Sequence, residues 1–162
     1  MPDAKPVSPP ALDPATVHPR IGSGYPPPFD QPVAAREKRA LGDAVGLKNF
    51  GVNLVRLPAG TASSQRHWHS HEDEFIYIVE GEVELVTDAG AQRLTAGMCA
   101  GFPAGRSDGH HLVNRSNGDV VYLEVGDRKE EDQCYYPDID LHIGPSATDA
   151  EFRLRHKNGE PY

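Results

Sequence analysis

The middle of the chain is a succession of short β-forming segments separated by turn residues, and this pattern limits the fold more than any other feature. Glycine, proline and asparagine turns divide it into eight segments: residues 52–57, 62–67, 74–79, 83–87, 91–94, 98–102, 110–114 and 120–125. Short strands at such even spacing are typical of a β-sandwich or β-barrel. Because 162 residues suffice for one domain with a sizeable core, the sequence predicts a single all-β domain.

The N-terminal segments have a different composition. Residues 1–32 contain ten of the fifteen prolines, which predicts an extended arm that Tyr25 and Phe29 can attach to the domain surface. Residues 33–43 are rich in helix formers and contain a glycine near their end, which predicts a short helix. The charged residues 36–39 are then interpreted as the solvated face of that helix.

The domain is expected to cover residues 33–162, with its barrel core at about 50–126 and a C-terminal extension at 127–162. The extension begins with an acidic run, residues 127–132, which is interpreted as solvated surface. Residues 152–156 alternate like a strand and precede a turn signal. They are expected to form an edge strand or to dock on a second subunit.

Histidine and acidic side chains crowd together before the third β segment. His67 and His69 are two positions apart, so in a strand their imidazoles point to the same face. Glu74 opens the next β segment and can add a carboxylate from a neighbouring strand. Two neutral imidazoles and a carboxylate are a donor set that divalent transition metals prefer. His71 shares the parity of the pair but lies beyond it, and is expected in a solvated turn.

A second stretch, residues 97–114, pairs with this one, and together they resemble the two motifs of the cupin superfamily. The first motif is matched by His67, His69, Glu74 and Gly81, with Gly60 one residue farther upstream than usual. The second motif is matched by Gly97, Pro103, Gly105, His110 and Asn114, with four residues before the histidine where two are usual. The resemblance covers residues 50–126.

The resemblance implies a double-stranded β-helix, the jelly-roll barrel of the cupins. It also implies one divalent transition metal bound by His67, His69, Glu74 and His110, with His111 as the alternative to His110. Iron, manganese, nickel, zinc and copper all accept such a set of ligands.

Strand alternation assigns neighbours to this metal. If Glu74 and His110 point inward, then Ile76, Ile78 and Leu112 do too, which predicts an apolar pocket. Trp68 is expected to face away from the metal and to pack against another layer. The loop 105–109 is expected to form the mouth of the pocket.

The composition excludes several partners. A formal net charge of −8 does not suit binding to nucleic acid, and no polybasic segment is present for an anionic membrane surface. The longest apolar run, residues 75–79, is too short to span a bilayer. The N-terminus lacks the apolar core of a signal peptide, which predicts a cytoplasmic protein. The cysteines, Cys99 and Cys134, are interpreted as reduced thiols.

The sequence favours a metal-dependent enzyme that acts on a small oxygen-rich or carboxylate substrate as a dioxygenase, an isomerase, or a decarboxylase or lyase. No residue stands out as a general acid or base, so the catalytic residues are left unassigned. The alternative is a barrel that binds or senses a small ligand without turnover. A structural or storage role is disfavoured because it needs no inward metal ligands. We also expect a homodimer in which the arm or the tail crosses to the other subunit.

Overall fold

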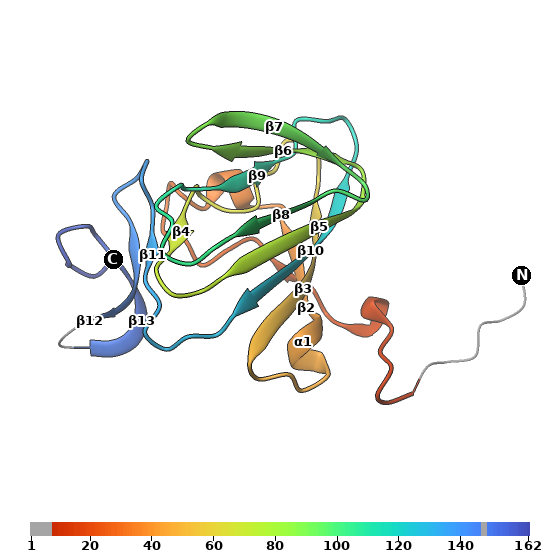
Figure 1. The fold of residues 1–162 in the computed structure, drawn as a ribbon, viewed down its shortest axis with the longest axis horizontal. Coiled ribbons are helices and arrows are strands. Elements are labelled where there is room, and N and C mark those ends of the chain that lie inside the picture. Colours follow the sequence, from red (N-terminus) through yellow and green to blue (C-terminus); the bar gives the residue numbers. More distant parts are fainter. Residues whose placement is uncertain (1–7, 147–148) are drawn as a thin grey trace, which may run out of the picture.

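The computed structural model describes residues 8–146 and 149–162, and in these ranges the chain is almost entirely β-structure. Figure 1 shows the strands wrapped into a barrel, with residues 8–19 lying outside it on one side. In chain order the elements are η1 (Pro14–Thr16), β1 (Arg20–Ile21), η2 (Gln31–Val33), β2 (Glu37–Ala40), α1 (Leu41–Ala44), β3 (Phe50–Leu57), β4 (Trp68–His69), β5 (Glu74–Glu80), β6 (Glu82–Thr87), β7 (Gly90–Thr95), β8 (Cys99–Phe102), β9 (His111–Val113), β10 (Val120–Asp127), β11 (Cys134–Tyr135), β12 (His142–Ser146) and β13 (Asp149–Arg155).

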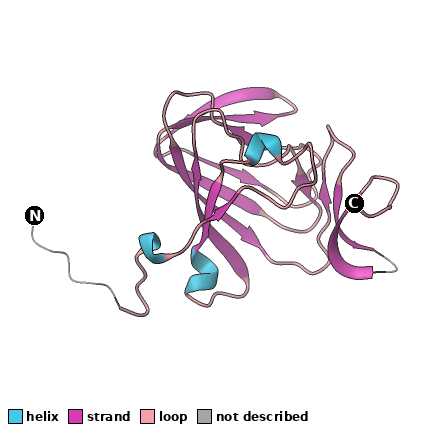
Figure 2. Cartoon of the chain, turned by 180° about the vertical axis from the view of Figure 1, so that it is seen from behind, coloured by secondary structure: helices cyan, strands magenta, loops and turns pink. Residues whose placement is uncertain are grey.

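The strands form three antiparallel sheets, which Figure 2 shows from behind. The largest has the order β1-β2-β3-β10-β5-β8, and a three-stranded sheet, β7-β6-β9, lies across the barrel from it. A four-stranded sheet, β13-β12-β11-β4, closes one end with the C-terminal extension. This all-β jelly-roll arrangement confirms the predicted fold class.

The core lies between the six-stranded and three-stranded sheets. It is built from alternate residues of facing strands: Val55, Leu57, Ile76, Ile78, Val83, Leu85, Leu94, Leu112, Val120 and Tyr122. Such alternation follows from the two-residue period of a strand, which sends every second side chain to the same face. Burial of these large apolar side chains is the main stabilising contribution to the barrel.

The predicted helix at residues 33–43 is wrong for most of its length. Only Leu41–Ala44 is helical, while Glu37–Ala40 is strand β2, which pairs with both β1 and β3. Helix propensity is a weak preference, and pairing with two neighbouring strands outweighs it. The predicted strand at 62–67 is also absent as a regular strand, because this segment makes only isolated bridges, from Ala62 to Val113 and from His67 to His110.

The later part of the N-terminal arm packs on its own chain. Tyr25 meets Tyr136 edge-on, with ring centroids 5.7 Å apart, and their hydroxyl oxygens lie 3.2 Å apart. Phe29 makes a similar edge contact with Tyr162. These contacts agree with the expectation that arm aromatics attach to the domain surface.

Two residues of the cupin-like motifs have structural roles. Gly81 has a φ of +81° in the turn between β5 and β6, and a Cβ there would collide with the carbonyl oxygen of Asp119. Asn114 is fully buried, and its side-chain amide donates to the carbonyl oxygens of Leu57 and Gly118. Both residues shape turns that hold the ends of barrel strands.

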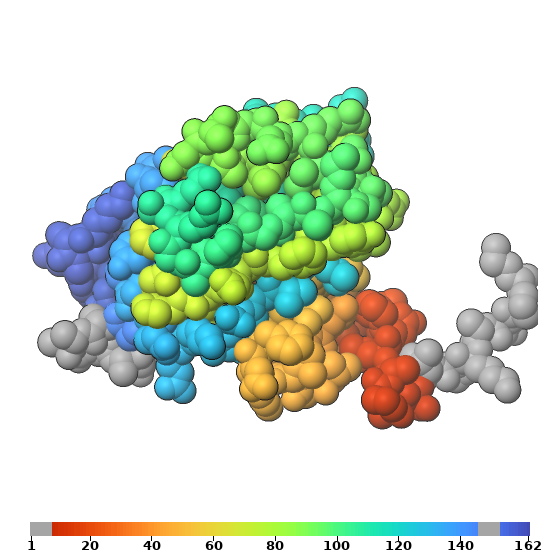
Figure 3. Space-filling view, in the orientation of Figure 1, coloured from red at the N-terminus to blue at the C-terminus, as the bar shows by residue number. Residues whose placement is uncertain are grey.

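The outer face of the six-stranded sheet is apolar where β5 crosses it. Phe75, Tyr77 and Val79 are each more than 40% exposed, and the half-buried Leu123 and Val125 of β10 stand opposite two of them. This surface faces the viewer in Figure 3, where β8, β5 and β10 run side by side.

In the part of the chain that the structure describes, none of the helices has the length and apolar character that a membrane span requires.

Candidate metal centre and its cavity

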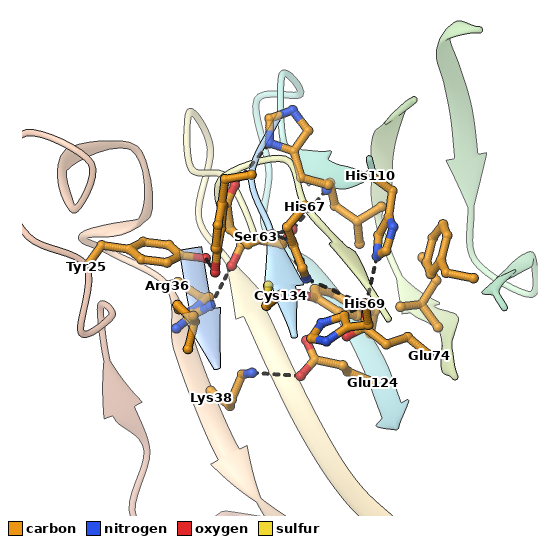
Figure 4. A pocket seen from close by; sticks show the side chains of 18 residues that line it. Tyr25, Arg36, Lys38, Ser63, His67, His69, Glu74, His110, Glu124 and Cys134 are labelled. Carbon is orange, nitrogen blue, oxygen red and sulfur yellow. Dashed lines mark hydrogen bonds and ion pairs between the residues drawn. The ribbon is translucent and has the colours of Figure 1, made fainter. Parts of the chain in front are cut away.

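The four residues predicted as metal ligands converge inside the barrel (Figure 4). The Nε2 atoms of His67 and His69 each lie 3.6 Å from Oε2 of Glu74, and Nε2 of His110 lies 2.8 Å from the same oxygen. The imidazole centroid of His67 is 5.0 Å from that of His69 and 4.9 Å from that of His110. Three imidazoles therefore surround one carboxylate oxygen.

In His67 and His69, a hydrogen bond at Nδ1 determines that Nε2 is the ring nitrogen available to a metal. Nδ1 of His69 lies 2.6 Å from Oδ2 of Asp132, and Nδ1 of His67 lies 2.9 Å from the carbonyl oxygen of Gln65. Each acceptor favours the tautomer with hydrogen on Nδ1, which leaves the lone pair on Nε2, facing Glu74. A carboxylate or carbonyl behind a histidine in this way is typical of metal-binding imidazoles.

The metal-free cluster binds protons strongly. Burial lowers the pKa of His67, but interactions with Cys134 and Glu74 outweigh it and raise the pKa to about 9. Burial also opposes the rise at His69, where hydrogen bonds with Asp132 and Cys134 raise the pKa to about 11. Burial alone would raise the pKa of Glu74, yet hydrogen bonds from histidines hold it well below its usual range. Protonation is thus favoured at His67 and His69, whereas burial lowers the pKa of His110.

The donor set fits a divalent transition metal. Three imidazole nitrogens and a carboxylate oxygen match the donors such ions accept, and the two supported histidines, once deprotonated, present their Nε2 lone pairs to the centre. The ring of His110 is fixed in another way, because it stacks on Phe102 with centroids 3.5 Å apart and planes 1° apart. A bound ion would have a residual positive charge after coordination by one carboxylate.

The candidate ligands His67, His69, Glu74 and His110 line one part of a cavity of about 260 Å³. In the view of Figure 4, Arg36 and Lys38 lie on one side of this cavity, and the histidines with Glu74 lie on the other. Lys38 donates to Glu124 over 2.6 Å. Arg36 is only 9% exposed and donates to the carbonyl oxygens of Gly22 and Ser63.

This cationic side corrects two expectations. Arg36 and Lys38 do not belong to the solvated face of a helix, because Lys38 lies in β2, Arg36 immediately precedes that strand, and both side chains line the cavity. The pocket is also less apolar than predicted: Ile76 and Leu112 line it, but Ile78 belongs to the core instead. The hydroxyl of Tyr122 lies in the same wall, where it is buried and makes no hydrogen bond of normal geometry with another described residue.

Other histidines of the sequence lie away from the cluster. His71 is exposed and bonds to its neighbour Ser70, as expected for a solvated turn. His111 lines another part of the cavity, where its Nδ1 lies 3.0 Å from the carbonyl oxygen of Ser64. His110 is therefore the histidine of the second motif that faces Glu74.

The expected orientation of Trp68 agrees with the structure, since its indole stacks on Tyr135 with centroids 4.4 Å apart. Arg106 and Asp108 line a separate small pocket of about 60 Å³ that also touches His69, Glu74 and His110. The loop before His110 thus approaches the cluster from a second side.

Two residues of the C-terminal extension belong to the site although their sequence positions did not predict it. Asp132 was assigned to a solvated acidic run but is fully buried against His69. Cys134 is 4% exposed and lines the cavity. Alternation was the available signal, because Asp132, Cys134 and Tyr136 are spaced by two and are all buried, while Tyr135 is exposed.

Comparison with known proteins places the chain in a family. The model of the cupin domain matches residues 53–126. The structure is similar to a sugar phosphate isomerase of the cupin superfamily from Silicibacter pomeroyi, with a TM-score of 0.87 and 42% sequence identity over 94% of this chain and 96% of that one. The chain therefore belongs to the cupin superfamily, as the two motifs predicted.

Two further structures extend this comparison. A candidate sugar phosphate isomerase from Acidithiobacillus ferrooxidans has a TM-score of 0.70 and 27% identity, over 80% of this chain and 81% of that one. A candidate oxalate decarboxylase from Thermotoga maritima has a TM-score of 0.58 and 21% identity, over 74% of this chain and 99% of that one, and shares the fold. No curated protein sequence matches the chain.

Proposed function

We propose that this protein is a metal-dependent isomerase of a small sugar phosphate, with His67, His69, Glu74 and His110 as the ligands of one divalent metal. The observation that carries the proposal is the division of one cavity into two parts. A metal donor set lies at one part, and the cations Arg36 and Lys38 lie at another. A phosphorylated sugar has matching ends, since its carbonyl and hydroxyl oxygens can chelate a metal and its phosphate needs cations.

The cationic part has unused capacity for an anion. Nε of Arg36 is buried and has no hydrogen-bond partner among the described residues, so a ligand oxygen could satisfy it. Lys38 has three donors, of which the bond to Glu124 uses one. A phosphate beside these side chains would replace water with charge-assisted hydrogen bonds.

The reaction needs only acid–base chemistry from the chain. Interconversion of an aldose and a ketose removes a proton from the carbon beside the carbonyl and returns one to the neighbouring carbon, so it consumes no oxidant. A bound metal would polarise the substrate oxygens. Glu74 and Glu124 are the carboxylates in the cavity wall. With Glu74 assigned to the metal, Glu124 is the candidate base, oriented by Lys38 and Asn53.

The comparison supports this substrate class over the other cupin reactions considered. The match with the Silicibacter pomeroyi isomerase extends over 94% of this chain, so it takes in most of the flanks that supply Arg36, Lys38 and Cys134. The cavity, at about 260 Å³, is slightly below the range of roughly 300–1,000 Å³ common for ligand pockets, which favours a small substrate. The net charge of −8 further disfavours large polyanions such as nucleic acid.

Solvent deuterium incorporation would test the reaction. Purified protein, stripped and reloaded separately with manganese, iron, cobalt, nickel, zinc or copper, is incubated in D₂O with three- to six-carbon aldose phosphates and followed by proton NMR. We expect ketose formation together with loss of the proton beside the carbonyl. The same sugars without phosphate should react far more slowly, and Glu124→Gln should abolish exchange. Absence of exchange with every metal and every sugar would overturn the isomerase proposal, and saturable binding without exchange would identify a sensing barrel.

Metal analysis tests the ligands separately. We expect His69→Ala to lose bound metal while the barrel stays folded, because the core is formed by other residues. His111→Ala is the matched control, since this neighbour of His110 lines the cavity without facing Glu74. Full metal occupancy in His69→Ala, or loss of metal in His111→Ala, would refute the assignment.

We further propose a cytoplasmic homodimer. The exposed apolar surface of Phe75, Tyr77 and Val79 is a feature of subunit interfaces, because isolated domains rarely leave large apolar side chains clustered in water. Light scattering of the full chain, and of a chain lacking residues 1–30, would show whether dimers form and whether the arm contributes. A monomeric mass at tens of micromolar would exclude the dimer.

A further inference from the structure

Strand pairing directs the thiol of Cys134 toward the candidate metal ligands. Strand β11 pairs with β4 so that Cys134 stands opposite His69 and Tyr135 stands opposite Trp68. Residues directly opposite each other in antiparallel strands project to the same face. The stacked rings of Trp68 and Tyr135 occupy one face, so the thiol of Cys134 and the imidazole of His69 share the other. Figure 4 shows the sulfur close to the histidines, within the cavity.

The sulfur is near enough to act as a donor with two of the histidines. One ligand atom each from His67, His69 and Cys134 lie within 4.8 Å of one another. A separate set, His67, Glu74 and His110, satisfies the same distance. The two sets therefore overlap at His67, and the shared oxygen of Glu74, 3.6 Å from Nε2 of both His67 and His69, links them.

The donor atoms of the two sets differ in chemical softness. Carboxylate oxygen suits manganese and other hard ions, whereas thiolate sulfur favours softer ions such as zinc. Imidazole nitrogen serves both kinds of ion. A cavity that holds histidines between a carboxylate on one side and a thiol on the other can adapt its ligand set to the ion.

We propose that His67, His69 and Cys134 form a second, overlapping site for a thiophilic divalent ion, in which Cys134 coordinates as a thiolate. Binding removes the thiol proton, which passes to solvent, and involves no change in oxidation state. The ion identity then decides whether Glu74 and His110 or Cys134 complete the coordination. A zinc-loaded protein would have a different open position toward the substrate from a manganese-loaded one.

This inference rests on His67 and His69 as metal ligands, as the proposed function assigns them. Cobalt spectroscopy can test the sulfur ligand separately from the histidine ligands. Metal-free protein is titrated with Co²⁺ without substrate, and the near-ultraviolet absorption is recorded. We expect a thiolate-to-cobalt charge-transfer band in the wild type and in Cys99→Ser, the control for the exposed cysteine. Cys134→Ser should bind cobalt without the band, and His110→Ala should keep it, because His110 lies outside the sulfur set.

The affinity for zinc and for manganese gives a second measurement, which does not depend on the cobalt charge-transfer band. Zinc affinity, measured by chelator competition, should fall by at least about tenfold in Cys134→Ser, whereas manganese affinity should stay within about twofold. Cys134→Ala repeats the test without a hydroxyl, and thermal denaturation of both variants verifies the fold. Cobalt bound to wild type without the band, or a band that survives in Cys134→Ser, would overturn the sulfur site while leaving the histidine ligands intact. Failure of cobalt to bind at all would overturn both.

Discussion

Asp132→Asn tests how the fold prepares His69 for metal binding. Oδ1 of Asp132 accepts hydrogen bonds from the backbone nitrogens of His71 and Glu72, at 2.8 and 3.2 Å, so the amide oxygen of an asparagine would take this place. The amide nitrogen would then face Nδ1 of His69, 2.6 Å away in the wild type. An amide nitrogen can only donate, so the ring would have to accept at Nδ1 and carry its hydrogen on Nε2.

That change of tautomer removes the lone pair that faces Glu74. Loss of a carboxylate behind a metal-binding histidine commonly weakens metal affinity by about 10–100-fold, which corresponds to roughly 1.4–2.8 kcal/mol. The same substitution exchanges a charge-assisted hydrogen bond for a neutral one, so the free energy of unfolding of the metal-free protein should fall by about 1–3 kcal/mol. The metal affinity should therefore change without loss of the fold.

Chelator competition at a temperature well below the unfolding transition would measure the affinity. Glu131→Gln is the matched control, because it makes the same charge change at the adjacent, exposed position. We expect wild-type affinity in Glu131→Gln and a loss of at least about tenfold in Asp132→Asn. An affinity within about twofold of wild type in Asp132→Asn would refute the orienting role.

Four further predictions concern pH, turn geometry and assembly. In the metal-free protein the pKa values of His67 and His69 are raised to about 9 and about 11, so a metal must displace protons to bind. The apparent metal affinity, measured by chelator competition, should therefore rise from pH 6.5 to 9. An affinity that does not change over this range would contradict the prediction. The same protonation of His67 stabilises the metal-free fold fully below pH 6.5 and is lost as pH rises through 9, so its melting temperature should fall over that range. Gly81→Ala should lower the free energy of unfolding by roughly 2–4 kcal/mol in urea titrations, because the added Cβ would collide with the carbonyl oxygen of Asp119. Gly60→Ala is the control, since Gly60 has a similar φ but open space around it, and it should cost only about 1 kcal/mol. Equal losses in the two variants would exclude the collision. Tyr77→Lys should convert a dimer to a monomer in light scattering, and an unchanged dimer mass would place the interface elsewhere.

The residues that the sequence analysis located are those fixed by short-range spacing. His67 and His69 are two positions apart, and Glu74 opens a strand whose alternate residues enter the core, so local periodicity was enough to direct them inward. His110 required the second motif, and the structure brings it to within 2.8 Å of Glu74. Most strands and turns of residues 50–127 were predictable for the same reason, since each depends on a few adjacent residues, whereas β1, β2, β11 and β12 were not predicted.

The residues that escaped the analysis depend on pairing between distant segments. Lys38 lies in a sequence of good helix formers, and only pairing with β3, which places it opposite Val55, makes that segment a strand. Asp132 follows several acidic residues, and only contact with His69, 63 positions earlier, buries it. Alternation with Cys134 and Tyr136 indicates that Asp132 can be buried, but a buried charge also needs a partner of opposite charge, and no local pattern identifies His69 as that partner.

The cavity is therefore assembled from two sources with different roles. The cupin domain match covers residues 53–126 and contains all four candidate metal ligands. Arg36 and Lys38 come before that region, while Cys134 and Tyr136 come after it, and all four line the same cavity. A barrel shared by proteins of different activities cannot by itself determine a reaction. The segments that flank the barrel supply the cations, the thiol and the buried carboxylate behind His69. If the proposed isomerase activity is correct, its substrate choice should therefore depend on parts of the chain that the cupin motifs do not include.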